Sequence, residues 1–279
     1  MQTYAPAKLN LCLYLGAPRA DGLHELCSLF EPLALADRIE VGEAERDEVI
    51  CPGVEGENLA ARALAALRAA SWDRTPLRIE IEKRIPIAAG LGGGSADAAA
   101  VLRLARGEVA DLGEIAAGLG ADVPSQLTPA LALVRGAGEQ VERLPAPVPH
   151  AVVLLPDGGG LSTAEVFAEA DRLGLGRRAE ELEELAGSLR TVAGEGASPL
   201  DYPELLVNDL EPAATSLWPR IGAALELLRG AGAAKALLTG SGPTVFGLFP
   251  ELVAAQAAAE RLGRDDAIVC EAGTAEASR

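Results

Sequence analysis

A glycine-rich loop between a strand and a helix constrains the fold of this chain more than any other feature. Residues 77–83 alternate strictly, with Leu77, Ile79 and Ile81 on one face and charged side chains on the other, which predicts a half-buried strand. The positions 90–94 then hold four glycines, and residues 96–106 are rich in alanine and leucine at helical spacing. The sequence therefore predicts the order strand, glycine loop, helix.

This loop is suited to binding an anion. Its glycines remove the side chains that would hold a ligand away from the backbone, and a helix beginning near Ser95 directs free N–H groups and its positive dipole end toward the loop. Such a site fits a polyphosphate, which is favoured over a flexible turn without function. No Gly-Lys-Ser/Thr of a Walker loop follows, and Ser95 stands where the dinucleotide fingerprint requires a third glycine. Ser95 could cap the helix, contact a phosphate oxygen or lie near a bound magnesium ion.

Composition narrows the classes of partner. The chain has 279 residues, of which 49% are hydrophobic, so it can build one large domain or two medium ones. Its formal net charge of −17 argues against nucleic-acid binding, which needs a basic face, and against docking on an anionic membrane. Of its 24 basic residues only Lys8, Lys83 and Lys235 are lysines, so each lysine is a candidate for a special role.

Cysteine usage and the N-terminal residues predict a cytoplasmic protein with reduced thiols. Neither a CxxC pair nor a His at metal-ligand spacing accompanies Cys12, Cys27, Cys51 and Cys270. Residues 1–8 have no signal-peptide pattern, and no run of about 18 apolar residues predicts a membrane span. No heptad pattern or apolar stripe in the sequence indicates an oligomeric state.

Further elements follow from periodicity and turn residues. Strands are predicted at 9–16, 38–41, 151–155, 235–238, 244–249 and 267–270, and helices at 57–70 with Asn58 as N-cap, 111–119, 162–173, 177–190, 219–229 and 251–262. Pro124 favours extended backbone at Val123, and residues 191–203 are expected to form a loop. The proline-rich residues 144–149 resemble a linker, so a domain boundary is expected there.

Several motifs together resemble a known superfamily. Residues 6–11 (PAKLNL), the segment from Lys83 through Ala99, and residues 239–246 (TGSGPTVF) resemble the three motifs of the galactokinase, homoserine kinase, mevalonate kinase and phosphomevalonate kinase (GHMP) superfamily. Residues 19–25 (RADGLHE), 120–124 (GADVP) and 208–211 (NDLE) narrow the resemblance to the 4-diphosphocytidyl-2-C-methyl-D-erythritol kinase family.

The resemblance implies a fold and a reaction. The fold would be α+β with the two-domain GHMP-kinase architecture: residues 1–148 would form a half like domain 2 of ribosomal protein S5, and residues 149–279 a ferredoxin-like half. The enzyme would be an ATP- and Mg²⁺-dependent phosphotransferase acting on the 2-hydroxyl of the cytidine-diphosphate-linked methylerythritol, in the non-mevalonate isoprenoid pathway. The alternatives are another GHMP kinase of homoserine or polyol type, and a non-catalytic nucleotide-binding relative.

The resemblance also assigns roles to residues. Asp122 would be the general base that takes the proton of the substrate hydroxyl, and Lys8 would keep that carboxylate ionised and stabilise charge on the attacking oxygen. The ATP loop would comprise Pro86, Ile87, Ala88, Ala89, Gly90, Leu91, Gly92, Gly93, Gly94, Ser95 and Ala96. The sequence does not identify the metal ligands.

Asn10, His24 and Phe167 match family positions that hold the substrate, with His24 near the cytosine edge and Phe167 stacked on the base. His150 lies outside these motifs and is interpreted as structural. The chain departs from the family at Leu23, where a tyrosine is usual. It also departs at Ser125-Gln126, in place of an aromatic pair, and at Pro129-Ala130, in place of two glycines.

Overall fold

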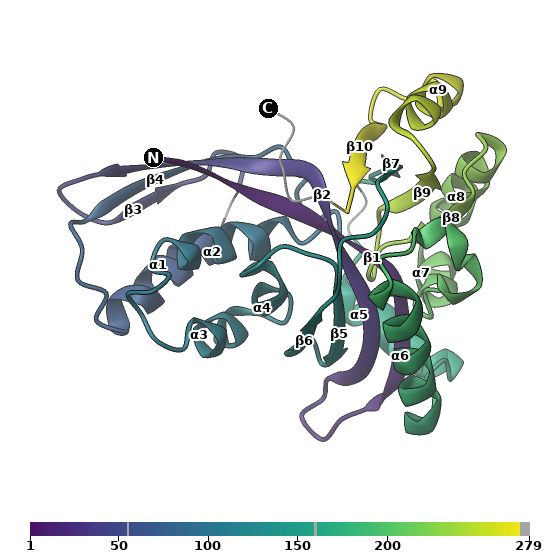
Figure 1. Ribbon diagram of the computed structural model, residues 1–279, viewed down its shortest axis with the longest axis horizontal. Helices are drawn as coiled ribbons and strands as arrows, with labels where there is room; N and C mark the ends of the chain where they lie inside the picture. The colour runs from purple at the N-terminus through teal and green to yellow at the C-terminus, as the bar shows by residue number, and fades with distance from the viewer. Residues whose placement is uncertain (55, 159–160, 274–279) are drawn as a thin grey trace.

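Two long antiparallel strands, β1 (Gln2–Pro18) and β2 (His24–Glu43), run through the whole molecule and connect its two lobes (Figure 1). The computed structural model describes residues 1–54, 56–158 and 161–273. One lobe contains the helices α1 to α4, and the other contains α5 to α9 (Figure 1). Because β1 and β2 belong to both lobes, residues near the middle of these strands lie where the lobes meet.

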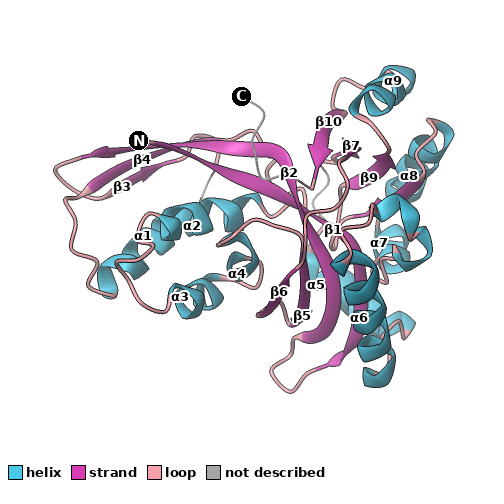
Figure 2. Ribbon diagram, in the orientation of Figure 1, coloured by secondary structure: helices cyan, strands magenta, loops and turns pink. Residues whose placement is uncertain are grey.

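The remaining elements mix helices and strands along the chain (Figure 2). The strands are β3 (Glu48–Ile50), β4 (Leu77–Glu82), β5 (Ala132–Gly136), β6 (Gln140–Arg143), β7 (His150–Leu155), β8 (Lys235–Leu238), β9 (Val245–Phe249) and β10 (Ile268–Ala272). The helices are α1 (Leu59–Ala69), α2 (Gly93–Arg103), α3 (Leu112–Leu119), α4 (Val123–Gln126), α5 (Thr163–Leu173), α6 (Ala179–Gly194), α7 (Glu211–Leu217), α8 (Arg220–Gly230) and α9 (Leu252–Leu262), with the 3-10 turns η1 (Pro199–Asp201) and η2 (Pro203–Leu205).

The sheet changes partners along β2. The C-terminal half of β2 pairs with β4 over Arg38–Glu43, whereas its N-terminal half pairs with β5 over Leu26–Phe30. A single pair, Ala272 with Leu33, joins β2 to β10 and so to the strands of the second lobe, in the order β3-β4-β2-β10-β7-β9-β8. The two lobes therefore share one bent sheet.

The buried apolar side chains form one cluster in each lobe and another where the lobes meet. One cluster packs α1 and α2 on β4, and another packs α5, α7, α8 and α9 on β7 to β9. A third cluster at the junction combines side chains of β1 and β2 with those of α6, β7 and β9. The domain boundary near residue 148 stays a prediction, because this junction core takes side chains from both sides of it.

Most of the predicted elements are confirmed. β4 buries Leu77, Ile79 and Ile81 as the alternation predicts. Asn58 caps α1, since its side chain accepts a hydrogen bond from the Ala60 N–H at 2.8 Å. The helix after the glycine loop begins at Gly93, two residues before Ser95. The mixed α and β content agrees with the predicted fold class.

Two local predictions are wrong. Val123 is helical instead of extended, because α4 places Pro124 in its first turn, where a missing N–H removes no helical hydrogen bond. Residues 191–203 are not a loop throughout, since α6 continues to Gly194 and η1 and η2 follow. Thr191 lies within α6, and its hydroxyl donates to the Gly187 carbonyl at 2.9 Å, as a threonine inside a helix commonly does.

Within the described ranges, the helices are too short or too polar to cross a bilayer.

Candidate active site

Lys8 and Asn10 lie on the same face of β1, at the point where this strand is distorted. The β1–β2 register shifts between Pro6 and Lys8 and again between Asn10 and Cys12. Such bulges redirect side chains and are frequent beside active sites. The short segment between the two irregularities directs both polar side chains into the junction of the lobes, where Lys8 is 6% and Asn10 2% exposed.

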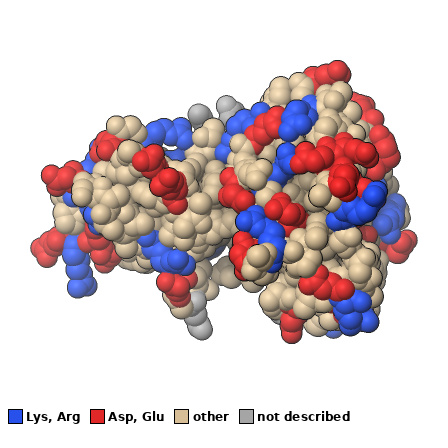
Figure 3. All heavy atoms as spheres, turned by 90° about the horizontal axis from the view of Figure 1, so that it is seen from below, with Lys and Arg blue, Asp and Glu red and all other residues tan. Residues whose placement is uncertain are grey.

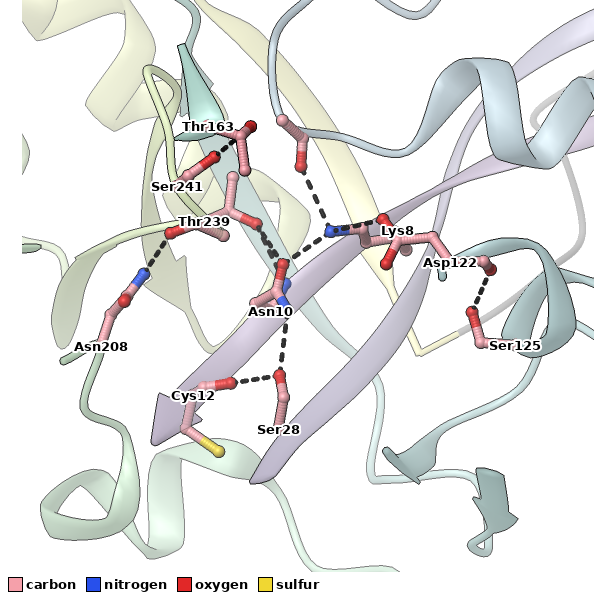
Figure 4. Close-up of polar contacts among 12 residues, drawn as sticks. Lys8, Asn10, Cys12, Ser28, Asp122, Ser125, Thr163, Asn208, Thr239 and Ser241 are labelled. Atoms are coloured by element: carbon pink, nitrogen blue, oxygen red, sulfur yellow. Dashed lines mark hydrogen bonds and ion pairs between the residues drawn. The ribbon is translucent and has the colours of Figure 1, made fainter. Parts of the chain in front are cut away.

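The ammonium group of Lys8 is surrounded by oxygen atoms (Figure 4). Its Nζ lies 2.7 Å from Asn10 Oδ1, 3.4 Å from the Gly90 carbonyl and 3.5 Å from Asp122 Oδ2. It also lies 4.8 Å from the centre of the Phe30 ring. The Lys8 side chain is 7% exposed and that of Asp122 is 33% exposed, so the carboxylate remains accessible to a ligand.

Asn10 connects Lys8 to the rest of the site. Its Nδ2 donates to Ser28 Oγ at 2.9 Å, and its backbone N–H donates to Thr239 Oγ1 at 3.0 Å (Figure 4). With Oδ1 accepting from Lys8, every polar group of the Asn10 side chain is used within the protein. The structure thus places Asn10 Oδ1 in direct contact with the ammonium group of Lys8.

The two predicted glycine segments meet beside Lys8. Gly90 has φ +74°, and a Cβ added to it would lie 2.7 Å from the Gly242 carbonyl oxygen. A Cβ on Gly92 would lie 2.9 Å from Lys8 Cγ. Both positions therefore need glycine, because any side chain would separate the loop from the second glycine turn or from Lys8.

The motif at residues 208–211 supports that second glycine turn. Asn208 Nδ2 donates to the carbonyls of Leu238 and Gly240, each at 2.8 Å. Glu211 Oε2 accepts from the Leu238 N–H at 3.0 Å. The motif holds residues 239–242 against the first loop, and Ser241 Oγ lies 2.9 Å from Thr163 Oγ1 (Figure 4).

A cleft of about 810 Å³ opens at this point. It brings together the predicted residues Lys8, Asn10, Asp122, His24 and Phe167, and it is also lined by Gly90, Gly92 and Ser95 of the loop. A volume in this range suits a cofactor or a small-molecule substrate.

The far wall of the cleft is formed by His24 and α5. The rings of His24 and Phe167 are 5.1 Å apart between centroids, and His24 Nε2 lies 2.8 Å from Asp171 Oδ1. Phe167 and Asp171 are one helical turn apart on α5, so they share a face. Leu23 also lines the cleft and is 52% exposed.

A second hollow of about 350 Å³ lies on the other side of the glycine loop. Its lining includes all of the predicted loop residues from Pro86 to Ser95, together with Asn58 and Lys83. Ala96 is fully buried within α2 and does not line this hollow.

Two charged residues of this lining have shifted pKa values. Burial raises the pKa of the Asp97 carboxyl to about 7. Burial alone would lower the pKa of Lys83, but the charge of Asp97 and hydrogen bonds to Asp37 and Asp97 outweigh it and raise the pKa.

Some residues of the site lie outside the sequence motifs and were not predicted. Phe30 and Asp171 line the cleft, and neither belongs to a motif. The i, i+4 spacing of Phe167 and Asp171 on a predicted helix could have indicated Asp171.

His150 is buried against Glu31, with Nε2 3.1 Å from Oε2. It lies outside the cleft lining, in agreement with a structural interpretation.

On the face drawn in Figure 3, basic side chains are interspersed with acidic ones. Among the described residues, no three His, Cys, Asp or Glu side chains are grouped to hold a metal ion by themselves.

Comparison with known proteins agrees with the geometry. Residues 58–127 match the GHMP kinases N terminal domain, and residues 178–267 match the GHMP kinases C terminal family. The chain is 40% identical to 4-diphosphocytidyl-2-C-methyl-D-erythritol kinase of Anaeromyxobacter sp. (strain Fw109-5), over 95% of this chain and 87% of that protein. It is 40% identical to the kinase of the same name from Pelotomaculum thermopropionicum, over 94% and 93%.

Solved structures give the same result. A crystal structure of 4-(cytidine 5'-diphospho)-2C-methyl-D-erythritol kinase superposes with a TM-score of 0.82 at 35% identity, covering 98% of this chain and 100% of that one. Homoserine kinase from Cytophaga hutchinsonii shares the fold, with a TM-score of 0.70 at 19% identity and coverage of 98% and 94%. The predicted family and fold class are confirmed: the chain belongs to the 4-diphosphocytidyl-2-C-methyl-D-erythritol kinase family of the GHMP kinases.

Proposed function

We propose that this protein transfers the γ-phosphoryl group of ATP to the 2-hydroxyl of 4-diphosphocytidyl-2-C-methyl-D-erythritol, a step of the non-mevalonate isoprenoid pathway. One observation carries the proposal. The Lys8–Asp122 pair lies between the glycine loop on one side and the wall of His24 and Phe167 on the other, within a single cleft. A phosphate donor and a nucleotide-linked alcohol can therefore meet at this pair.

Asp122 and Lys8 would act on the attacking hydroxyl. The hydroxyl oxygen forms a bond to the γ-phosphorus while the bond from that phosphorus to the bridging oxygen of ADP breaks, and Asp122 accepts the hydroxyl proton before passing it to solvent. Lys8 stabilises negative charge on the attacking oxygen, and loop N–H groups bind the phosphates. Phosphoryl transfer depends mainly on such positioning and charge stabilisation.

Magnesium would enter bound to ATP. Since the protein groups no carboxylates into a metal site of its own in the described residues, the Ser95 hydroxyl, which lines both the cleft and the hollow behind the loop, is the proposed protein ligand. Mg²⁺ commonly takes phosphate oxygens, water and few protein ligands. Its contribution would be to neutralise charge on the transferred phosphoryl group.

The wall of the cleft would recognise cytosine. Phe167 offers a stacking surface, which is worth about 1–3 kcal/mol per base in single-strand binders. A neutral His24 that donates its Nε2–H to Asp171 keeps Nδ1 as an acceptor. An acceptor suits the amino group of cytosine and disfavours the carbonyl of uracil, which supports a cytidine-linked substrate.

The proposed division of labour follows the two lobes. Residues 1–148 would supply the catalytic pair and the ATP loop, and residues 149–279 would supply Phe167 and the second glycine turn. The net charge of −17 supports a small-molecule substrate over nucleic acid. The free thiols of Cys12, Cys27, Cys51 and Cys270 support action in the cytoplasm.

The decisive measurement is ADP release from ATP and Mg²⁺ with the cytidyl substrate, beside homoserine and mevalonate. We expect turnover only with the cytidyl substrate. Asp122→Asn should lower kcat by about two to four powers of ten, because general-base catalysis is lost. Asp111→Asn is the matched control, since Asp111 precedes α3 without a side-chain capping bond and lies outside the cleft lining.

Other outcomes would redirect the proposal. Turnover with homoserine or mevalonate instead would assign another GHMP activity. ATP binding without turnover on any of the three alcohols would favour the non-catalytic relative. Near-normal activity in Asp122→Asn would overturn the role of Asp122 as base.

A further inference from the structure

Lys83 is a largely buried lysine just before the glycine loop, and the proposed reaction gives it no role. Its side chain is 11% exposed, and its ammonium group donates to Asp37 Oδ2 and, at 2.8 Å, to Asp97 Oδ2. Asp37 is fully buried and Asp97 is 3% exposed. These three side chains, the Asp37–Lys83–Asp97 triad, come from β2, from the residue that follows β4 and from α2.

Asp37 holds the backbone that leads into the loop. Its Oδ1 accepts the N–H of Arg84 at 2.6 Å and the N–H of Ile85 at 2.8 Å. Hydrogen bonds to an ionised carboxylate are stronger than bonds between neutral groups. The two peptide groups immediately before Pro86 are therefore fixed to β2 through one side chain.

Asp97 and Lys83 hold the backbone that leaves the loop. Asp97 lies in the second turn of α2, and a Cβ added to Gly93, the first residue of that helix, would lie 3.2 Å from Lys83 Nζ. The ammonium group thus packs directly against the start of the helix whose free N–H groups face the loop. One cation therefore connects the two ends of the ATP loop, the first through Asp37 and the second through Asp97 and the start of α2.

We infer that Lys83 is a positioning residue for ATP, which with Asp37 and Asp97 fixes the two ends of the glycine loop so that its N–H groups converge on the phosphates. Both Lys83 and Asp97 line the hollow behind the loop. Apolar side chains can replace a buried ion pair at little cost in stability, or even with a gain, so a network with two carboxylates on one lysine is better explained by the geometry it imposes. The inference rests on the proposed function, because it takes the loop as the ATP site.

The test compares two aspartates with similar partners. Asp37 accepts bonds from one cationic side chain and two backbone N–H groups, and Asp47 from one cationic side chain and one backbone N–H. Asp47 does so from Arg68 at 2.7 Å and from the Leu77 N–H at 2.8 Å, outside the lining of both hollows. We would measure KM for ATP, KM for the cytidyl substrate, kcat and Tm in Asp37→Asn and Asp47→Asn.

A positioning role predicts a selective change. Asp37→Asn should raise KM for ATP at least fivefold, with KM for the cytidyl substrate within twofold of the wild-type value. Asp47→Asn should lower Tm and leave both KM values unchanged. If Asp37→Asn lowers Tm while its KM for ATP stays at the wild-type value, the triad is only structural and the inference is wrong.

A second, milder variant tests the inference if Asp37→Asn does not fold. Asp97→Asn leaves the bonds of Asp37 intact, and we expect it to raise KM for ATP at least twofold without changing KM for the cytidyl substrate. If Asp37→Asn does not fold and Asp97→Asn has the wild-type KM for ATP, the inference is also overturned. Absence of ADP release by the wild-type protein would instead be a failure of the proposed function.

Discussion

The Nζ of Lys8 lies 3.5 Å from Oδ2 of Asp122, and the lysine side chain is buried whereas a third of the aspartate side chain remains exposed. Lys8 lies on β1 and Asp122 is the residue immediately before α4, so the pair exists only when the first lobe is folded. The exposed part of Asp122 faces the cleft that also contains the proposed base-recognition wall. This asymmetry suits a cation that stays in place and a carboxylate that exchanges a proton with a ligand.

Arginine should not replace Lys8. The Nζ of Lys8 lies 2.7 Å from Asn10 Oδ1, 3.4 Å from the Gly90 carbonyl and 3.5 Å from Asp122 Oδ2, and the longer, planar guanidinium cannot keep these contacts of a compact ammonium group. We expect Lys8→Arg to lower kcat by about a hundredfold or more, measured as ADP release. Lys235→Arg is the matched control, because the Lys235 ammonium group is exposed and donates to the Pro203 carbonyl. Equal activity of both variants would contradict the role of Lys8.

Alanine at position 90 should damage the ATP site. Gly90 has φ +74°, and the added Cβ would lie 2.7 Å from the Gly242 carbonyl oxygen. We expect the unfolding free energy to fall by about 2 kcal/mol, from backbone strain and the displaced second glycine turn, and KM for ATP to rise. Urea denaturation and steady-state kinetics would measure both. Gly113→Ala in α3 should be neutral or stabilising, since nothing lies within 4 Å of its added Cβ.

Much of the fold could be predicted from local pattern. Strict alternation identified β4, and Asn58 before an apolar repeat identified the start of α1. The full extent of β1 could not be predicted, because it contains Pro6, and a proline within a run argues against a strand interior. Its bulges beside Lys8 and Asn10 depend on the register of its pairing with β2, which the periodicity of β1 alone does not reveal.

Part of the candidate site could also be predicted from the residues themselves, and part could not. The glycine loop predicted an anion site without any relative, whereas the roles of His24 and Phe167 came from the resemblance alone. Asp171 was missed because its contact with His24 joins residues 147 positions apart. Val123 was misread because a proline restricts its predecessor outside a helix but is accommodated in a first helical turn.

A tyrosine at position 23 should strengthen substrate binding. Leu23 lines the cleft and is 52% exposed, so a larger ring can be placed opposite Phe167 without displacing a buried side chain. Stacking on a base is worth about 1–3 kcal/mol, and we expect Leu23→Tyr to lower KM for the cytidyl substrate by about threefold or more, with KM for ATP unchanged.

The control for this gain is Leu173→Tyr, an equally conservative change at an exposed leucine of α5 that is absent from the cleft lining. Competition by cytidine diphosphate would show whether the gain lies in base binding. If Leu23→Tyr and Leu173→Tyr behave alike, the wall formed by His24 and Phe167 does not bind the base.

The pH dependence of stability should report the buried carboxyl of Asp97. Burial raises its pKa from the ordinary value of 3.8 to about 7 in the folded protein. One carboxylate oxygen has no hydrogen-bond partner among the described residues. The charged groups that face it are Lys83 and Asp37. Burial and, after it, the charge of Asp97 raise the pKa of the nearby Cys51 thiol.

The sign of the effect follows from proton binding. Between pH 4 and 7 the folded protein holds a proton on Asp97 that the unfolded chain releases, so the unfolding free energy falls as pH rises through this window. A shift of about three pKa units corresponds to at most about 4 kcal/mol. Asp97→Asn cannot titrate, so chemical denaturation at pH 5 and pH 8 should show a smaller loss of stability in the variant than in the wild-type protein. Parallel pH profiles for the two proteins would mean that Asp97 is already ionised at pH 5, held so by Lys83.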